Sequence, residues 1–232
     1  TPAEGDYFSF SLDGATRETN DRIRGKGSYE ACLDGIRRAN RQGFTTSLIY
    51  TISRDNIHEL ELMAPLVKTL GIDRFFIQVI GLRGKAALES GTSESAHSPQ
   101  VSRSHWLKTI PRVARLIGES GITVTYPKVF LEPGEVFECA GKVADNYFVF
   151  PNGSVYRCPL CEDFPIHSLC FEEDRLVPTA RLNEQDFFEL DIPEGCVMNK
   201  MIQPQNIIYD KQGVPEYKIA CCLLKEELKI ER

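Results

Sequence analysis

The sequence predicts an α/β fold in its first part, followed by a small cysteine-rich α+β module that contains a β-hairpin. Strand-like and helix-like stretches alternate as far as about residue 127, which is typical of βα units around a parallel sheet. Seven of the eight cysteines lie after residue 138. These two observations place the expected domains at residues 1–130 and 131–232.

The first part should contain three complete βα units and one further strand. The strands are expected at residues 7–12, 45–52, 73–80 and 122–126. Apolar residues recur at helical spacing between these strands, and helices are expected at residues 28–42, 56–70 and 102–120. Ser28 should cap the first of these helices. The polar residues 81–100 form a stretch long enough to be a functional or mobile loop.

Asn152 and Gly153 predict the β-hairpin of the second part. Strand-like residues 147–150 and 154–158 flank this pair, and Asn-Gly readily adopts the positive φ angles of a tight turn. Three further elements are expected downstream, namely a short capped helix at residues 183–190 and extended segments at residues 206–209 and 217–224.

Charge and hydropathy argue against two classes of partner. The net charge is -6 with a pI near 5.4, and apolar or acidic residues interrupt the basic runs, so we expect no nucleic-acid binding. No window approaches 18 consecutive apolar residues, and the first residues contain neither a basic start nor an apolar run. We therefore expect a cytoplasmic protein that does not enter a membrane.

Cys139, Cys158 and Cys161 give the strongest chemical signal. A tight turn at Gly153 should bring Cys158, at the end of the second hairpin strand, back toward Cys139, which precedes the first strand. Cys161 follows after a two-residue gap, which suits neighbouring thiolates that share a metal. Soft ligands that face one volume indicate an iron–sulfur cluster or zinc, whereas a lone cysteine is more often a small buried hydrophobe.

Zinc is the competing metal, because four thiolates also suit a structural zinc site. Zinc modules usually contain two close cysteine pairs, whereas only Cys158 and Cys161 are paired in this way here, so the cluster is favoured. The adjacent cysteines at 221–222 would point to opposite faces of a strand, so at most one should be a ligand. We interpret Cys32 and Cys170 as structural.

Several segments resemble radical S-adenosylmethionine (SAM) enzymes of the peptide-modifying and anaerobic-sulfatase-maturing type. The fourth strand and following helix of that family are similar to residues 10–14 (FSLDG), 21–25 (DRIRG) and 28–30 (SYE). The end of its fifth strand and the loop after its sixth resemble residues 51–56 (TISRDN) and 80–86 (IGLRGKA).

The spacing from Cys139 through Gly153 to Cys158 is similar to the opening of the SPASM and twitch domains that follow the barrel in this family. The resemblance covers residues 5–225 and implies the C-terminal half of a partial (βα)6 TIM-like barrel, followed by a SPASM- or twitch-like domain. The few cysteines after Cys158 fit the twitch type, with one auxiliary [4Fe–4S] cluster. Its further expected ligands are Cys161, Cys196 and Cys221.

The resemblance also implies a SAM site at the strand ends. Ser11 and Arg24 would bind the ribose or the amino-acid part of SAM, and the backbone of Val79, Ile80 and Gly81 would face its adenine. This place is physically reasonable, because parallel barrels bind ligands at the carboxyl ends of their strands. The alternatives are that Asp13 and Gly14 form a plain turn at the end of the strand and that Arg24 is a solvated charge on a helix.

The three-cysteine motif that binds the catalytic cluster in this family is missing from the sequence. We therefore expect an inactive fragment that begins near the fourth strand, with a degenerate protein as the alternative. The intact enzyme would generate a 5′-deoxyadenosyl radical and act as an oxidoreductase or maturase on a peptide, a protein side chain or a small molecule. A flavodoxin or ferredoxin would reduce it. The alternative function is a non-catalytic zinc-binding or peptide-binding module.

Overall fold

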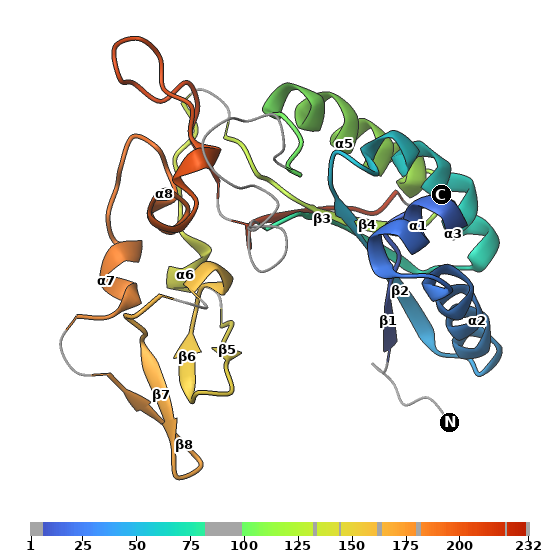
Figure 1. The fold of residues 1–232 in the computed structure, drawn as a ribbon, viewed down its shortest axis with the longest axis horizontal. Coiled ribbons are helices and arrows are strands. Elements are labelled where there is room, and N and C mark those ends of the chain that lie inside the picture. Colours follow the sequence, from blue (N-terminus) through green and yellow to red (C-terminus); the bar gives the residue numbers. More distant parts are fainter. Residues whose placement is uncertain are drawn as a thin grey trace. The chain divides into compact units, whose positions relative to one another are not determined.

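The computed structural model describes residues 7–81, 99–131, 134–143, 145–161, 164–179, 182–220 and 222–230 (Figure 1). The chain divides into two units. Unit 1 comprises Thr1–Pro127 and Lys225–Arg232, and unit 2 comprises Lys128–Leu224. The division thus lies three residues before the expected boundary at 130, and the C-terminal segment, expected in the second domain, belongs to unit 1. The expected loop at 81–100 lies almost entirely outside the described residues.

Unit 1 is built on a five-stranded sheet whose order is β1-β2-β3-β4-β9. Its strands are β1 (Tyr7–Ser11), β2 (Thr45–Ile52), β3 (Arg74–Val79), β4 (Thr123–Pro127) and β9 (Lys225–Leu228). The first four are parallel, and β9 pairs with β4 in the antiparallel sense. The α/β class and the four expected strands are therefore confirmed, whereas the strand that the C-terminal segment adds to the sheet was not foreseen.

Helices connect the parallel strands of unit 1. They are α1 (Arg17–Arg24), α2 (Ser28–Arg41), the 3-10 helix η1 (Ile57–Leu62), α3 (Met63–Leu70) and α5 (Arg103–Gly118). In α5, Ile110, Val113 and Ile117 recur at helical spacing and are fully buried, since this face packs against β4. Leu48 and Phe75, on neighbouring strands, complete the core from the sheet.

The start of α2 differs from the expectation. Ser28 is the first helical residue, and Gly27 occupies the N-cap position with a φ of 86°. Because Gly27 has no side chain to act as a cap, the carboxylate of Asp21 accepts the backbone N–H groups of Gly27 and Tyr29, at 2.7 and 2.9 Å. These two bonds, led by that from Gly27, lower the pKa of Asp21. A residue at the end of α1 thus caps the next helix.

Unit 2 contains a four-stranded antiparallel sheet of order β5-β6-β7-β8. Its strands are β5 (Phe148–Val149), β6 (Ser154–Tyr156), β7 (Leu169–Glu172) and β8 (Arg175–Pro178). The predicted hairpin joins β5 to β6: Gly153 has a φ of 84°, and the Asn152 side chain accepts the N–H of Ser154 at 3.0 Å. The Asn-Gly signal therefore located this turn correctly.

Short helices complete unit 2. They are α6 (Ala140–Val143), η2 (Pro159–Cys161), α7 (Glu184–Phe188), α8 (Val197–Ile202) and η3 (Pro204–Asn206). The expected helix at 183–190 is confirmed, with Asn183 and Asp186 forming a capping box. The expected extended pair at 206–209 and 217–224 is not found as strands in the described residues. Instead, Tyr209 forms an isolated bridge with Pro215, and Ile219 bridges to Phe130 and Gly195.

Among the residues that the structure describes, no helix has the length and apolar character needed to cross a membrane.

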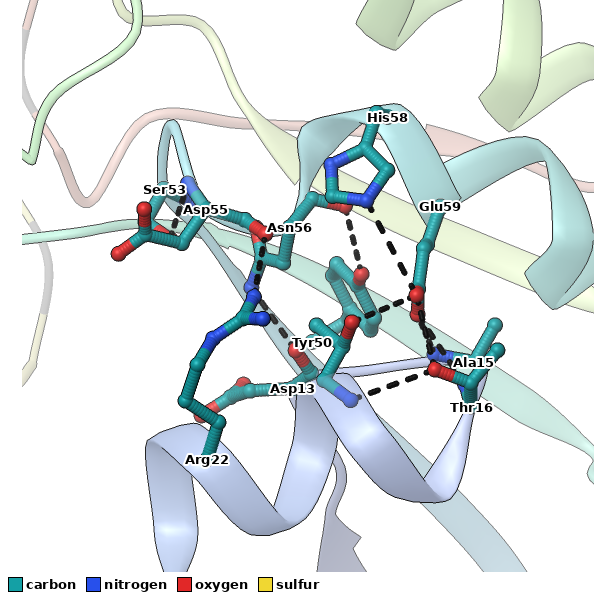
Figure 2. Close-up of polar contacts among 11 residues, drawn as sticks. Asp13, Ala15, Thr16, Arg22, Tyr50, Ser53, Asp55, Asn56, His58 and Glu59 are labelled. Atoms are coloured by element: carbon teal, nitrogen blue, oxygen red, sulfur yellow. Dashed lines mark hydrogen bonds and ion pairs between the residues drawn. The ribbon is translucent and has the colours of Figure 1, made fainter.

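The loop between β1 and α1 is fixed by Glu59 of η1 (Figure 2). Its carboxylate accepts the N–H groups of Ala15 and Thr16 and the hydroxyl groups of Thr16 and Thr19, at 2.6–3.1 Å. Burial by itself raises the pKa of Glu59, but these hydrogen bonds outweigh it and lower the pKa. The ionised side chain therefore ties two segments that lie about forty residues apart in sequence.

Gly14 lies where the chain after β1 passes close to α1, so we predict that Gly14→Ala destabilises the protein. A Cβ atom there would stand 2.4 Å from the backbone nitrogen of Asn20, which cannot move without distorting the helix. We expect a loss of about 1–3 kcal/mol in the free energy of unfolding, measured by chemical denaturation. Gly118→Ala is the matched control, because its Cβ would meet the flexible Ile230 side chain at 3.5 Å. Equal stability of the two variants would contradict this prediction.

We predict that Glu59→Gln lowers the free energy of unfolding by about 1–3 kcal/mol at neutral pH, because the amide offers fewer and weaker acceptors. The folded pKa of Glu59 lies below its ordinary value of 4.5, so its stabilisation is complete above that pH and is lost as the pH falls through the folded pKa. The difference in the free energy of unfolding between wild type and variant should therefore narrow as the pH falls, which chemical denaturation at several pH values measures. Glu61→Gln, at an exposed position, is the control. A difference in the free energy of unfolding that does not depend on pH would count against this role of the Glu59 carboxylate.

Candidate functional site

The predicted SAM-binding residues of unit 1 lie at or beside the carboxyl edge of its parallel strands. Ser11 ends β1, Val79 ends β3, and Ile80 and Gly81 follow directly. Arg24 ends α1 and reaches back to the residues after β1. The chain therefore brings all five to one edge of the sheet, as a site at strand ends requires.

The sheet register sets how far apart these residues are. Ser11 pairs with Ile49, and Ile49 pairs with Phe76, so Val79 lies three residues beyond the level of Ser11. Three residues along a strand span about 10 Å, and two strand spacings between β1 and β3 add about 10 Å across the sheet. A ligand that contacts Ser11 and the segment after β3 must therefore be elongated, as SAM is.

Arg24 is held at this edge by an ion pair with Asp13. Its Nε atom donates to Oδ2 of Asp13 at 2.7 Å, and the side chains are 33% and 9% exposed. No other hydrogen bond of Arg24 is found in the described part of the chain. The guanidinium is thus oriented rather than freely solvated, and it can bind a carboxylate or hydroxyl group of a ligand.

Asp13 also fixes the strand ends themselves. Its Oδ1 accepts the N–H of Thr51 at 2.8 Å, and its backbone N–H donates to the Asn20 side chain at 2.9 Å. The fully buried Asn56 donates from Nδ2 to the carbonyl of Asp13 at 3.1 Å (Figure 2). The same nitrogen donates to the carbonyl of Thr51 at 2.8 Å. Tyr50, whose pKa is raised by burial, donates its hydroxyl to the Asn56 carbonyl at 2.9 Å.

Asn20 and Asn56 were not foreseen as supports of this edge. Asn56 lies inside a segment that resembles the family and Asn20 directly precedes one, but nothing in the local sequence shows that a buried asparagine will bind a distant strand end. The described end of the long loop also returns here, because the Arg54 N–H and Nε donate to the carbonyls of Pro99 and Gln100, each at 2.9 Å. Residues 99–100 therefore border the same edge.

Four of the five predicted metal-binding cysteines meet in the core of unit 2. Cys139, Cys158, Cys161 and Cys196 are each at most 7% exposed and belong to one buried cluster with Tyr156, Leu160, Phe188, Met198, Ile207 and Ile219. We call this group the cysteine cluster. Since these four cysteines come from segments spread over more than fifty residues, the fold rather than local sequence assembles them.

Short contacts connect members of the cysteine cluster. A side-chain hydrogen bond joins Cys158 and Cys161, and the backbone turn between them closes through Cys161 N–H donating to the Cys158 carbonyl at 3.2 Å. Cys196 lies close enough to Cys161 to contribute to the raised pKa of the Cys161 thiol. Cys139 and Cys196 also line one small hollow. Cys196 also caps α8 by accepting the Asn199 N–H at 3.4 Å.

The titration of Cys161 reflects this setting. The hydrogen bond with Cys158 lowers the pKa of Cys161, but burial and the carboxylate of Glu184 outweigh it, so the pKa is raised. The thiol is therefore protonated at neutral pH and becomes a thiolate when a metal ion competes for the proton.

The remaining cysteines differ in position. Cys221 lies outside the described residues, and the half-buried Cys222 packs against the cysteine cluster. Cys170 lies in β7, where it pairs with Ser154 of β6, and Cys32 lies on α2 in unit 1. These two positions are separate from the cluster, in keeping with their interpretation as structural.

The buried thiols do not form a preformed single-ion site in the described part of the chain. In the described part of the chain, no three His, Cys, Asp or Glu side chains converge as closely as one metal ion requires. Each thiolate of a four-iron cluster binds its own iron, so the ligands need to surround a larger volume. Four buried thiols in one dry core meet that requirement in residue type and burial.

No family model matches the sequence. The chain is 24% identical over 223 residues to the AdoMet-dependent heme synthase of Methanosarcina barkeri, a match that covers 92% of the chain and 60% of that protein. It is 36% identical over 72 residues to the mycofactocin maturase MftC of Mycolicibacterium smegmatis, which covers 30% of the chain and 18% of that protein. The chain thus spans less than two thirds of either relative.

A similar fold occurs in the crystal structure of Streptococcus suis SuiB bound to S-adenosylmethionine. The TM-score is 0.51 at 11% sequence identity, over 88% of this chain and 45% of SuiB, so the likeness concerns the fold alone. The two sequence relatives and SuiB are radical SAM enzymes. This chain is therefore a relative of radical SAM enzymes, as the resemblance of its segments predicted.

Proposed function

We propose that this chain is part of a radical SAM oxidoreductase or maturase, in which unit 1 contributes to SAM binding and unit 2 holds an auxiliary [4Fe–4S] cluster. The observation that carries the proposal is the gathering of four buried cysteines in unit 2, beside a sequence relationship to radical SAM enzymes. In such enzymes, one electron from a reduced cluster breaks the bond between the sulfur and the 5′ carbon of SAM. Methionine and a 5′-deoxyadenosyl radical result, and the radical takes a hydrogen atom from the substrate.

The role proposed for unit 1 is to orient SAM. Arg24, held by Asp13, would pair with the carboxylate of its methionine part or with a ribose hydroxyl. Ser11 would bind a polar group beside it, while the backbone of Val79, Ile80 and Gly81 would face the adenine. The separation of these two groups along and across the sheet supports an elongated ligand at this edge.

The role proposed for unit 2 is to hold the cluster away from water. Its ligands would come from Cys139, Cys158, Cys161, Cys196 and Cys221, of which the first four are buried together. The aromatic rings of Tyr156 and Phe188 in the same core exclude solvent from the sulfur atoms, which protects a cluster and influences its potential.

We propose a peptide or protein side chain as the substrate. One relative is named a maturase, which supports a peptide, whereas another is named a heme synthase, which supports a small molecule as the alternative. A flavodoxin or ferredoxin in the cytoplasm would supply the electron. No nucleic-acid partner is proposed, because the net charge is -6.

We predict that the protein, reconstituted anaerobically with iron and sulfide, binds about four of each per chain in unit 2 and absorbs visible light. Cys158→Ala should lower this content at least twofold, because it removes a buried thiolate from the cysteine cluster. Cys170→Ala is the control, since this half-buried residue lies in β7 outside the cluster, and it should retain the full content.

The same measurement tests the alternative of a zinc-binding module. Stoichiometric zinc without sulfide, or equal iron content in both variants, would overturn the cluster proposal. Iron and sulfide lost in Cys158→Ala alone would support it.

We predict that Arg24→Gln weakens SAM binding about tenfold or more in equilibrium dialysis, because a charge-assisted hydrogen bond contributes about 1.5–3 kcal/mol. Arg37→Gln is the control: Arg37 is exposed on α2 and pairs with Asp34. Thermal unfolding of each variant separates loss of binding from loss of fold. Unchanged affinity in a folded Arg24→Gln variant would exclude Arg24 from the SAM site.

A further inference from the structure

We propose that Lys225, the first residue of β9, binds a carboxylate group of the substrate beside the candidate SAM site. This inference rests on the proposed function and specifies the chemistry of its substrate. The sequence around Lys225 does not point to this role, because the residue lies in a charged segment near the C-terminal end of the chain. Its position follows from the pairing of β9 with β4.

Helices cover one face of the sheet in unit 1, where α2 packs against β1 and β2 and α5 packs against β4. Phe10 of β1 points to this face, because a Cβ atom on Gly35 of α2 would stand 2.8 Å from its ring. Leu48, Phe75 and Val124 lie at the same level on the next three strands and are fully buried. Since side chains alternate along a strand, the residues one position further point to the opposite face.

The opposite face of the sheet is polar near the carboxyl ends of the parallel strands. Each of the five strands contributes a hydroxyl, carboxamide or ammonium group to it, namely Ser11, Thr51, Gln78, Thr125 and Lys225. Gln78 and Lys225 are exposed, whereas Ser11 and Thr51 are half-buried. Because Ser11 is one of the predicted SAM-binding residues, this polar face borders the candidate SAM site.

The ammonium group of Lys225 lies over this polar face. Its Nζ atom is 5.8 Å from the centroid of the Phe76 ring, although Phe76 belongs to β3, two strands away from β9. The side chain therefore reaches back across β4 toward the middle of the sheet. Phe76 is level with Ser11 and two strand spacings from it, which is about 10 Å. A substrate group can thus meet the ammonium while SAM occupies the strand ends.

The positive charge of Lys225 is not balanced by an acid of the described residues. In this part of the chain it forms no ion pair, and its ammonium contacts the Phe76 ring. Glu227 lies on the same face two residues further along β9 but is not paired with it. Glu226 points to the other face, where it accepts the Tyr126 hydroxyl. The polar face therefore offers a cation to an anionic ligand.

The surroundings of the ammonium favour a carboxylate on a partly apolar molecule. One ammonium balances the single charge of a carboxylate, and the exposed carboxamide of Gln78 is a further donor on the same face. The half-buried side chains of Ile49 and Phe76 lie between Ser11 and Lys225 and offer an apolar surface. The Phe76 ring also restrains the ammonium, because a cation within about 6 Å of an aromatic ring is attracted to it.

The test measures how Lys225→Gln changes the binding of two probes to the reconstituted protein. Mesoporphyrin IX carries propionate groups on a flat apolar ring, and a short blocked peptide of alanine and serine carries one glutamate side chain. We expect the variant to bind at least one probe about tenfold more weakly, because a charge-assisted hydrogen bond is lost. The methyl ester of each probe lacks the charge and should bind wild type and variant equally.

Three further variants serve as controls. Lys225→Arg keeps the charge and should restore most of the affinity. Lys68→Gln removes an exposed lysine on α3 and should leave the affinity unchanged. Glu227→Gln should strengthen binding about twofold or more, because it removes a like charge from the same face.

The SAM affinity of the same samples, measured by equilibrium dialysis, separates this inference from the proposed function. If wild type binds no SAM, the proposed function fails and this inference falls with it. If Lys225→Gln weakens the binding of SAM instead of the probes, Lys225 binds the carboxylate of SAM and the inference is overturned.

The probes decide the remaining outcomes. In wild type that binds SAM, failure to bind either probe would overturn the inference, as would an affinity that Lys225→Gln does not change or changes equally for acid and ester. A loss confined to mesoporphyrin supports the inference with a small-molecule substrate. A loss confined to the peptide supports it with a peptide substrate.

Discussion

The buried carboxylate of Asp13 is the group on which the candidate SAM site of unit 1 depends. It pairs with Arg24 at the end of α1 and accepts the N–H of Thr51 near the end of β2. Asp13 itself follows β1, so one side chain connects two strand ends and a helix end. Because Arg24 balances the charge of the buried Asp13 side chain, the arginine is oriented before any ligand binds. The rest of the edge is then held by Asn56 and Glu59.

Buried carboxylates have a comparable position in unit 2, although the chemistry around them differs. Glu194 is balanced by Lys200 and lies two residues before Cys196, so it stabilises a segment that carries a cysteine. Glu184 reaches the core from α7 and meets the thiol of Cys161. Among the residues that the structure describes, unit 2 buries few large apolar side chains outside the cysteine cluster, so a bound iron–sulfur cluster would contribute to its folding free energy as well as to its chemistry.

Much of the fold was predictable because its signals are local. The alternation of strands and helices located the parallel strands of unit 1, Asn152-Gly153 located the hairpin, and the expected capped helix at residues 183–190 was found as α7. The errors also have a physical reason. Ser28 was expected to cap α2, yet Asp21 from the preceding helix does so, and the C-terminal segment 225–228 pairs with β4 a hundred residues away. When the contact partner of a residue comes from a distant part of the chain, the sequence immediately around that residue does not reveal it.

The sequence by itself determined the class of fold, the cysteine-rich second part and the relationship to radical SAM enzymes, since periodicity, turn residues and motif spacing are properties of neighbouring residues. Only the tertiary structure decided which polar groups meet. It paired Arg24 with Asp13, placed Asn56 against two strand ends and brought Glu184 to Cys161. The reason is that a buried polar side chain must find a partner, and which partner it finds depends on how the whole chain packs.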